Sequence, residues 1–384
     1  MGEVREGRVE RVVAGGLALL RSRGEVCFVP GALPQELVRY EISGKRRGVL
    51  QGELRTVLEA SPNRVEPPCR YYRACGGCEL QEMAYEQQLS VKAGMLVEQL
   101  KRLGGFDQPR VREIRYGASY GYRTRVRMHR SGEGGYGFRR RRSREVVPVE
   151  RCIVATEGIN EKIPTLRGEG DQVLLSESDD GVLLSGSPEA ETTGAVTLLG
   201  RTVHFSRAGF FQSNLALFER LLEELIGVVD WGQGGRLYDL YAGSAAISSV
   251  VASKLIPKPE EICCVESDSR SADLIADNLC ELAHTVYREP VERFVRHASP
   301  PCRESVVILD PPRAGLSPAV RGWLAAGSPR QLCYISCDPA TFARDLGDLK
   351  GRYTLEEVIP FDFFPQTSHV ESLALLTPRG EGDR

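Results

Sequence analysis

Cys337 and Glu371 are the two residues whose types and positions best suit covalent chemistry. Cys337 directly follows the apolar run QLCYIS and begins CDPATFARDL, while Glu371 lies in FDFFPQTSHVESLALL, just before the last apolar run. Most cysteines next to a strand are inert core residues, and a solvated side chain is the ordinary alternative for a glutamate. Because Cys337 lies beyond the last apolar residue of its strand, at a sheet edge that also suits a cofactor, we predict a nucleophile and a nearby base.

A thiolate with a nearby carboxylate suits methylation at carbon 5 of a uracil ring. That carbon becomes nucleophilic only after a thiolate adds to carbon 6 and creates an enolate, which can attack a sulfonium methyl group. The adduct must then lose its carbon 5 proton to a general base before the thiolate is eliminated. Since both faces of the ring are used, the base must leave any stack or come from a single-stranded loop.

The cofactor is predicted from two neighbouring strands. RLYDL runs into the small-residue turn of YAGSAAISSVVASKL, which resembles the strand–loop–helix site of nucleotide-like ligands. Glu266 ends the next strand, EEICCVE, where its carboxylate can accept bonds from two ribose hydroxyls. The further glycines of a dinucleotide fingerprint are missing. We therefore predict S-adenosylmethionine rather than NAD, with Asp310 of DPPRAGL at the same edge; amine methylases follow such a motif with an aromatic residue, whereas Arg313 follows here.

Three closely spaced cysteines indicate a metal site. They stand as C-x5-C-G-G-C, and a fourth candidate follows in VERCIV: Cys69, Cys75, Cys78 and Cys152. Buried core cysteines are the ordinary alternative. We do not favour it, because the three cysteines are so close in sequence and the Gly-Gly pair lets the backbone wrap tightly around a bound group. Four thiolates satisfy tetrahedral zinc as well as a cubane cluster. The long first gap and the remote fourth ligand favour iron–sulfur.

A block of arginines predicts a surface for RNA. The whole chain has a net charge of −2, but thirteen arginines and four glutamates lie between Arg110 and Arg151, a local balance of 13 − 4 = +9. Such a block is often a solvated or disordered face. Here tyrosines and other apolar residues alternate with the arginines, and guanidinium groups grip phosphate and stack on bases. We predict a folded, RNA-facing sheet.

The order of elements predicts three domains and a multidomain β and α/β fold. Short alternating apolar runs predict a small β-barrel over residues 1–57. A mainly β central domain over 58–200 contains the cysteines and a helix from Tyr85 to Leu103. After residue 200, apolar strands alternate with amphipathic stretches, which predicts a doubly wound parallel sheet over 201–384.

Composition predicts a cytoplasmic protein. No run of 18 apolar residues could span a membrane, and the start MGEVREGRVE does not match a signal peptide. Eleven cysteines without such a signal favour a reducing compartment. RNA is the expected partner; neither a membrane nor an obligate protein partner is expected.

Taken together, these motifs resemble the RNA 5-methyluridine methyltransferases of the TrmA and RumA type. GRVERVVAGGLALLRSRGEVCFVPGALPQELV is similar to their TRAM domain, an OB-like RNA-binding barrel. CRYYRACGGCELQEMAYEQQLSVK is similar to their iron–sulfur region, and GFFQSN to a cofactor-contacting loop. DPPRAGL, YISCDPATFARD and FPQTSHVE are similar to their catalytic motifs. The resemblance covers almost the whole chain.

The resemblance implies a C-terminal Rossmann-like class I methyltransferase domain, against which the helix at 84–107 packs. It implies a 4Fe-4S cluster on Cys69, Cys75, Cys78 and Cys152. It also implies S-adenosylmethionine contacts from Gln212, Tyr241, Glu266 and Asp310, around a turn that contains Gly243. Finally, it implies Cys337 as nucleophile and Glu371 as general base.

Three positions depart from the family pattern. Ala245 stands where relatives usually have glycine, and its methyl group would crowd the cofactor if the residue needs positive φ. Pro290 replaces a polar residue that would contact adenine. Asp338 replaces an asparagine after the nucleophile, and its charge would raise the pKa of the thiol.

The sequence leaves the substrate open. A uridine in 23S ribosomal RNA is favoured, and a uridine of the transfer RNA T-loop is the alternative. The three departures also motivate a non-catalytic RNA-binding iron–sulfur protein. A cytosine-5 methylase is disfavoured, because such enzymes usually carry a Pro-Cys turn and here Ser336 precedes Cys337.

Overall fold

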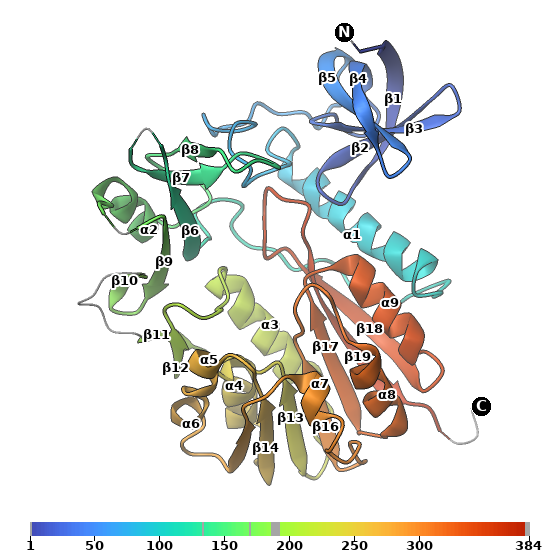
Figure 1. Ribbon diagram of the computed structural model, residues 1–384. Coiled ribbons are helices and arrows are strands. Elements are labelled where there is room, and N and C mark those ends of the chain that lie inside the picture. Colours follow the sequence, from blue (N-terminus) through green and yellow to red (C-terminus); the bar gives the residue numbers. More distant parts are fainter. Residues whose placement is uncertain (1, 133, 169, 186–192, 381–384) are drawn as a thin grey trace.

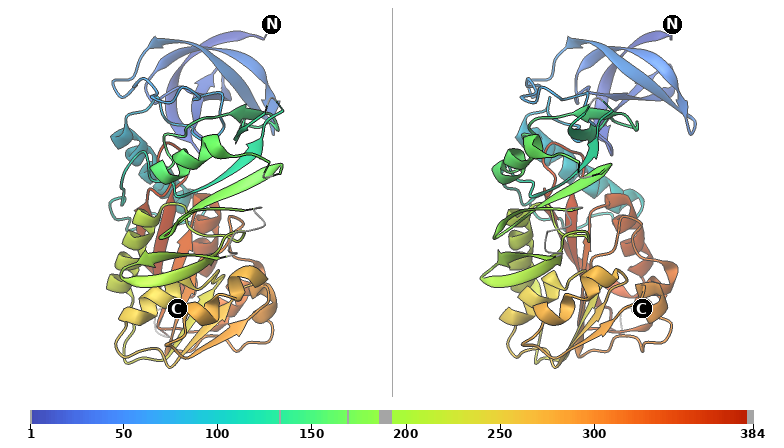
Figure 2. Two further views of the ribbon diagram at one scale, coloured as in Figure 1. Left: turned by 90° about the vertical axis from the view of Figure 1, so that its left-hand side faces the viewer. Right: turned by 60° about the vertical axis from the view of Figure 1, so that its left-hand side comes forward.

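A computed structural model describes residues 2–132, 134–168, 170–185 and 193–380. A β-barrel lies at one end of the molecule, a large C-terminal sheet with its helices lies at the other, and a smaller sheet lies between them (Figures 1 and 2). None of the helices in these ranges has the length and apolar character to cross a membrane.

The N-terminal strands form the predicted barrel. It is closed in the order β1-β2-β3-β5-β4, with bounds Val4–Val13, Leu17–Ser22, Glu25–Pro30, Leu37–Arg46 and Val49–Glu59 for β1 to β5. Alternate residues fill its interior because successive side chains of a strand point to opposite faces; the fully enclosed ones include Ala18, Leu20, Cys27, Val29, Val38 and Tyr40. The prediction of a small barrel is confirmed.

Helix α1 (Tyr85–Arg102) confirms the predicted helix, ending one residue earlier than expected. Its apolar face packs against α9 (Pro339–Leu349), and Leu96 and Leu100 belong to the same core as the C-terminal strands. Figure 1 shows α1 running alongside α9 and the red strands. A helix that precedes the central sheet in the chain is thereby built into the C-terminal body.

The central sheet has the order β10-β9-β6-β7-β8. In chain order its strands are Arg125–Arg130 (β6), Tyr136–Arg139 (β7), Val146–Pro148 (β8), Gln172–Ser178 (β9) and Gly181–Leu184 (β10). Helix α2 (Glu157–Lys162) and a 3₁₀ turn (Ile163–Thr165) cover its apolar side.

The first part of the arginine block lies outside this sheet. Its backbone runs beside β18 (Tyr353–Phe361), with bridges at Val111 and Arg115. Arg112 forms an ion pair with Glu357 at 2.5 Å, and Arg115 forms one with Glu224 at 2.5 Å. The expectation of one RNA-facing sheet over the whole block is therefore wrong here, because these arginines bind the protein's own carboxylates.

The C-terminal sheet has the order β15-β14-β13-β16-β17-β19-β18. Strands β13 to β17 pair in parallel, whereas β19 is antiparallel to both β17 and β18. The bounds are Arg236–Leu240 (β13), Glu261–Val265 (β14), His284–Tyr287 (β15), Ser305–Leu309 (β16), Gln331–Ser336 (β17) and Glu371–Pro378 (β19). The predicted parallel sheet thus ends in an antiparallel pair.

Both faces of this sheet are covered. One face packs against helices Leu215–Val228 (α3), Ala246–Lys254 (α4), Ser269–Ala272 (α5) and Ile275–Asn278 (α6), and against the hairpin Thr193–Leu198 (β11) and Arg201–Ser206 (β12). The other packs against Val291–Phe294 (α7), Pro318–Ala326 (α8), α9 and α1. Alternate residues of each strand enter the two cores, as a sheet buried on both faces requires.

The pairing of the strands suggests small changes to the domain boundaries expected at 57 and 200. The last barrel strand reaches Glu59. The turn at Leu199 and Gly200 lies inside the β11–β12 hairpin, both strands of which pack in the C-terminal core. We propose that the barrel ends after Glu59 and that the C-terminal domain begins before Thr193.

Candidate active site

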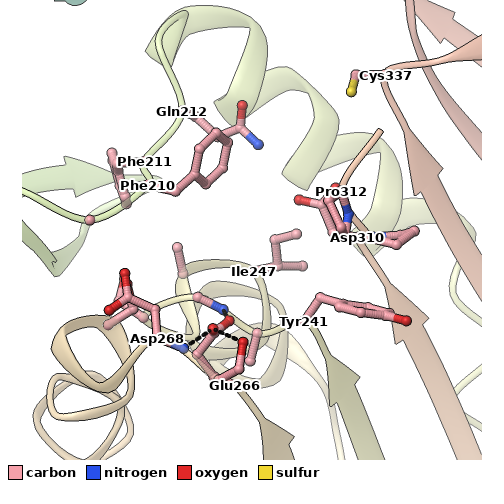
Figure 3. Close-up of a pocket in the computed structure, with 18 of the residues that line it drawn as sticks. Phe210, Phe211, Gln212, Tyr241, Ile247, Glu266, Asp268, Asp310, Pro312 and Cys337 are labelled. Atoms are coloured by element: carbon pink, nitrogen blue, oxygen red, sulfur yellow. Dashed lines mark hydrogen bonds between the residues drawn. The ribbon is translucent and has the colours of Figure 1, made fainter. Parts of the chain in front are cut away.

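One cavity of about 880 Å³ lies at the carboxyl ends of the parallel strands. The structure brings seven of the predicted site residues to it: Gln212, Tyr241, Gly243, Glu266, Asp310, Cys337 and Glu371. Figure 3 shows Gln212 and Glu266 on opposite sides of this cavity, with Cys337 beyond Asp310. Ligands of open α/β sheets bind at this edge.

The turn after β13 forms the floor of the cavity. Tyr241 and Ala242 each donate a backbone N–H to the carbonyl of Val265, at 3.0 and 3.1 Å, which ties the turn to β14. Gly243 has a φ of +57° and donates its N–H to Oε2 of Glu266 at 2.8 Å. The other oxygen of Glu266 accepts from Asp268 N at 2.6 Å. Oε1 also accepts from Ser267 Oγ at 3.5 Å, whereas Oε2 keeps a second lone pair, so Glu266 can still accept from a ligand hydroxyl.

Ala245 has the positive φ on which the expected crowding depended, at +60°. Its side chain is nevertheless fully buried in the core between the sheet and α3 and α4, and it does not line the cavity. The expectation that its methyl group crowds the cofactor is therefore wrong. Pro290 does line the cavity, at the N-terminus of α7.

The loop before α3 forms the opposite wall. Arg125 is 7% exposed, and its Nη2 donates to the carbonyls of Arg207 and Gly209, which fixes the loop just before Gln212. Burial, followed by the charge of Arg127, lowers the pKa of Arg125 to about 10. Phe210 is 70% exposed beside the cavity. A flat aromatic surface of this kind can stack on a base.

Asp310 follows β16 and lies within the cavity lining. Its burial and the nearby carboxyl of Asp239 raise the pKa of Asp310 to about 7. Burial is also the main reason that the pKa of Asp239 is raised to about 6. Both carboxyls therefore keep their protons to a higher pH than an ordinary aspartate does.

Cys337 and Glu371 lie opposite each other at the end of the β17–β19 pair. Ser336 pairs with Ser372, so the next residue of each strand, Cys337 and Glu371, takes the facing position. Glu371 is 4% exposed, whereas Cys337 is half-buried. This register explains why two residues 34 positions apart meet at one point of the cavity.

Arg313 is the cation that acts on both groups. The pKa of the Cys337 thiol is raised to about 11: burial is the main cause and the charge of Glu371 adds to it, while the guanidinium of Arg313 opposes both by its charge and by a hydrogen bond. Burial and Asp310 raise the pKa of Glu371 well above its usual value, and Arg313 opposes this. Arg313 also contacts His369 Nε2 at 3.3 Å.

Asp338, which was expected to raise the pKa of the thiol, caps the helix that follows the nucleophile. Its carboxylate caps helix α9 by accepting from Ala340 N at 3.1 Å and Thr341 N at 2.9 Å. A helix N-terminus compensates negative charge. The main influences on the pKa of Cys337 are burial, Glu371, Arg313 and Asp310. The carboxylate of Asp338 therefore stabilises the N-terminus of α9.

A second cavity, of about 200 Å³, is lined by all four predicted metal ligands: Cys69, Cys75, Cys78 and Cys152. The pKa of Cys75 is raised to about 11 and that of Cys78 to about 12, mainly by burial, with a smaller contribution from the charges of the other thiols. Within the part of the chain that is described, no histidine, cysteine, aspartate and glutamate side chains are grouped so that they could hold a metal ion. Four thiols that line one cavity are chemically suited to a thiolate-bound group.

Two arginines lie between the cavities. Arg123 and Arg127 line both the large cavity and the thiol cavity. They flank the start of β6, the strand that carries Arg125 between them. This part of the arginine block is where positive side chains reach the site.

Comparison with known proteins agrees with this geometry. Residues 300–379 match the family model described as tRNA (uracil-5-)-methyltransferase. An uncharacterized RNA methyltransferase of Aquifex aeolicus is 31% identical, over 96% of this chain and 97% of that protein. The chain belongs to the RNA uracil-5-methyltransferase family. Members of this family are S-adenosylmethionine-dependent enzymes, so the activity class predicted from the sequence is confirmed.

Two further relatives illustrate the range of this methyltransferase family. The 23S rRNA (uracil(1939)-C(5))-methyltransferase RlmD of Pseudomonas putida is 28% identical, over 96% of this chain and 92% of that protein. The crystal structure of the tRNA (uracil-54, C5)-methyltransferase of Pyrococcus abyssi, in complex with S-adenosyl-L-homocysteine, aligns with a TM-score of 0.75 at 21% identity. It covers 97% of this chain and 100% of that one, and it supports the fold.

Sequence reasoning missed the role of Arg313. The motif DPPRAGL was used only to separate this methyltransferase from amine methylases, although an arginine three residues after Asp310 must lie at the same sheet edge as Cys337. Phe210 was also missed, because an exposed aromatic cannot be told from a buried one by type alone.

Proposed function

We propose that this enzyme transfers a methyl group from S-adenosylmethionine to carbon 5 of a specific uridine in 23S ribosomal RNA, with Cys337 as nucleophile and Glu371 as general base. The observation that carries the proposal is the facing pair of thiol and carboxyl at the end of β17 and β19, in a cavity whose floor presents Glu266. Both groups therefore reach one ring from neighbouring strands.

The cofactor site is assigned to the residues at the strand ends. Glu266, fixed by two backbone N–H groups, accepts hydroxyl groups of the ribose. Gly243 and Tyr241 shape the turn on which the adenosine lies, and Gln212 and Asp310 contact the cofactor from the facing wall and the sheet edge. Bound S-adenosylmethionine supplies the electrophilic methyl group.

Charge explains how one pocket serves two steps. Ionised Glu371 disfavours the Cys337 thiolate, so the neutral form of the carboxyl favours attack on carbon 6. Arg313 stabilises the thiolate at that stage. Once sulfur is bonded to carbon 6, its charge is gone, and because linkage between two titrating groups is reciprocal, Glu371 ionises more easily. The carbon 5 enolate attacks the methyl group of S-adenosylmethionine, and S-adenosylhomocysteine leaves. Glu371, which has released its own proton to water, then removes the carbon 5 proton, and the sulfur leaves by elimination as the thiolate.

The RNA enters beside the arginines of β6. Arg123 and Arg127 line the cavity and can bind phosphate oxygens of the backbone. Phe210 is exposed at the same opening and provides a stacking surface for an unpaired base. These contacts hold a uridine that has left its stack.

The thiol cavity is proposed to hold a 4Fe-4S cluster on Cys69, Cys75, Cys78 and Cys152. Four thiolates are the ligand set of a cubane as well as of zinc. The long gap between Cys69 and Cys75 and the remote position of Cys152 favour the cubane, and all four side chains line one cavity. Its proposed part is to fix the segment that contains these cysteines.

Transfer RNA is the second candidate substrate. The ribosomal proposal is supported by the name of the Pseudomonas putida relative, which matches nearly the full chain. The alternative is supported by the family model and by the Pyrococcus abyssi structure, whose descriptions name transfer RNA.

A methylation assay on unmodified transcripts tests the proposal. The purified protein is incubated with methyl-labelled S-adenosylmethionine and either 23S ribosomal RNA or transfer RNA, and the modified nucleoside is identified by mass spectrometry. We expect 5-methyluridine in the ribosomal transcript and no label with Cys337→Ala. Label in transfer RNA alone would show that transfer RNA, not ribosomal RNA, is the substrate. Label in 5-methylcytidine would show that the proposed methylation of uridine is wrong.

A further inference from the structure

The loop between β18 and β19 positions the proposed base. It spans residues 362–370 and ends directly before Glu371. In Figure 1 this red loop rises from the C-terminal sheet toward the beginning of α1. Its contacts come largely from residues that precede the catalytic domain in the sequence.

Helix α1 holds the first half of this loop. Lys92, which is fully buried, forms an ion pair with Asp362 and donates to the carbonyl of Phe364 at 2.9 Å. The side-chain amide of Gln88 makes two bonds to Gln366: its Nε2 donates to Gln366 Oε1 at 3.0 Å, and its Oε1 accepts from the backbone N–H of Gln366 at 3.1 Å. The loop is therefore anchored before it reaches Ser368.

Glu79 holds the second half. Its backbone N–H donates to the carbonyl of Gln366 at 2.8 Å. Its Oε2 accepts from Ser368 N at 3.1 Å and from Ser368 Oγ at 2.6 Å. Glu79 directly follows Cys78, and Ser368 lies three residues before Glu371. One carboxylate therefore connects the thiol segment to the base.

The same carboxylate connects the barrel to this point. Oε1 of Glu79 forms an ion pair with Arg141 at 3.1 Å, and Arg141 also bonds the carbonyl of Gly15 in the β1–β2 turn. Gly15 N donates to Ser368 Oγ at 2.8 Å. Glu79, Arg141, Gly15 and Ser368 form a closed ring of contacts drawn from the barrel, the thiol segment, the central region and the catalytic loop.

We propose that Glu79 is a positioning residue for the proton-abstraction step, because its carboxylate fixes the backbone at Ser368 and thereby sets the place of Glu371. The inference rests on the proposed function. Without the carboxylate, the N–H of the largely buried Ser368 loses its acceptor, and an unpaired buried donor drives the backbone to shift. A base displaced by about 1 Å can lose about 100-fold in rate.

The test uses natural uridine RNA and the variant Glu79→Ala. Attack by Cys337 and methyl transfer do not need the base, whereas elimination does. We expect kcat to fall by about 10- to 100-fold with little change in KM for RNA, and the covalent protein–RNA adduct to accumulate on a denaturing gel. Glu79→Gln keeps an oxygen for Ser368, so it should restore part of the turnover and show less adduct.

Glu41→Ala is the matched control. Glu41 is 22% exposed against 16% for Glu79, and it also accepts from one arginine, Arg55, and one backbone N–H, that of Gly2, but within the barrel. It should behave as wild type. Hydrogen–deuterium exchange gives a readout independent of turnover: residues 362–370 should exchange faster in Glu79→Ala and at the wild-type rate in Glu41→Ala.

Glu371→Gln separates failure of this inference from failure of the proposed function. Accumulation of adduct in Glu371→Gln together with wild-type turnover in Glu79→Ala would overturn the role of Glu79, as would parallel loss of adduct and turnover in Glu79→Ala. If neither Glu371→Gln nor the wild type on 5-fluorouridine RNA forms an adduct, the proposed covalent mechanism itself is wrong.

Discussion

Replacement of Arg313 by methionine tests the electrostatics of the nucleophile. Methionine keeps much of the apolar stem of arginine and removes only the charged end. The pKa of Cys337 is raised to about 11, mainly by burial, and this value already includes the lowering effect of Arg313. The substitution therefore leaves the raising influences, burial, Glu371 and Asp310, without opposition.

The expected change in the thiolate fraction of Cys337 follows from its pKa. A thiol with a pKa of about 11 is ionised to about one part in a thousand at pH 8. An opposite charge in contact lowers a pKa by about 1 to 3 units. Loss of Arg313 should therefore raise the pKa of Cys337 by at least about one unit and reduce the thiolate at pH 8 about tenfold or more. In both proteins reactivity should rise with pH, since the thiolate forms only as pH approaches the pKa.

Alkylation measures the thiolate directly. The rate at which iodoacetamide modifies Cys337 is followed by peptide mass spectrometry between about pH 7 and pH 10, because only the thiolate reacts. Lys350→Met is the control, since Lys350 bonds the carbonyl of Gly105, away from the cavity. Equal rates for Arg313→Met and wild type across this range would refute the reasoning.

Three further outcomes are expected. Gly243→Ala places a side chain at a φ of +57°, which costs about 1–2 kcal/mol. If the free turn relaxes and binding must restore it, calorimetry should show roughly tenfold weaker S-adenosylmethionine binding, and unchanged affinity would contradict this. Lys92→Met leaves Asp362 buried without its cation, so urea unfolding should show a loss of about 3–5 kcal/mol; a loss below about 1 kcal/mol would mean that the pair contributes little. Cys152→Ser should lower the iron and sulfide content of anaerobically purified protein, and wild type with zinc and no iron would exclude the cluster.

The elements that the sequence predicted are those governed by local periodicity. Alternation of apolar residues in the first 57 positions predicted the barrel, and the helical spacing from Tyr85 predicted α1, because both patterns depend on residues a few positions apart. That the seven predicted site residues would lie close together in one cavity was also predictable from the sequence. Parallel strands bring their carboxyl ends to one edge, whatever lies between them.

The parts that could not be predicted depend on contacts between distant residues. Nothing local in FDFFPQTSHVE indicates that Lys92 and Glu79, more than 260 positions earlier, hold this loop. The side-chain direction of Ala245 depends on how α4 packs, which decides that the methyl group enters the core. The pairing of Arg112 with Glu357 likewise removed charge that composition alone assigned to RNA.

The central claim is that Cys337 bonds covalently to a uracil ring during catalysis. The most direct measurement is the mass of the protein after incubation with S-adenosylmethionine and RNA containing 5-fluorouridine, for wild type and Cys337→Ala. Fluorine at carbon 5 cannot leave as a proton, so the account predicts a stable wild-type adduct carrying the transferred methyl group, and none with the variant. Methyl transfer without an adduct, or an equal adduct in Cys337→Ala, would contradict the account.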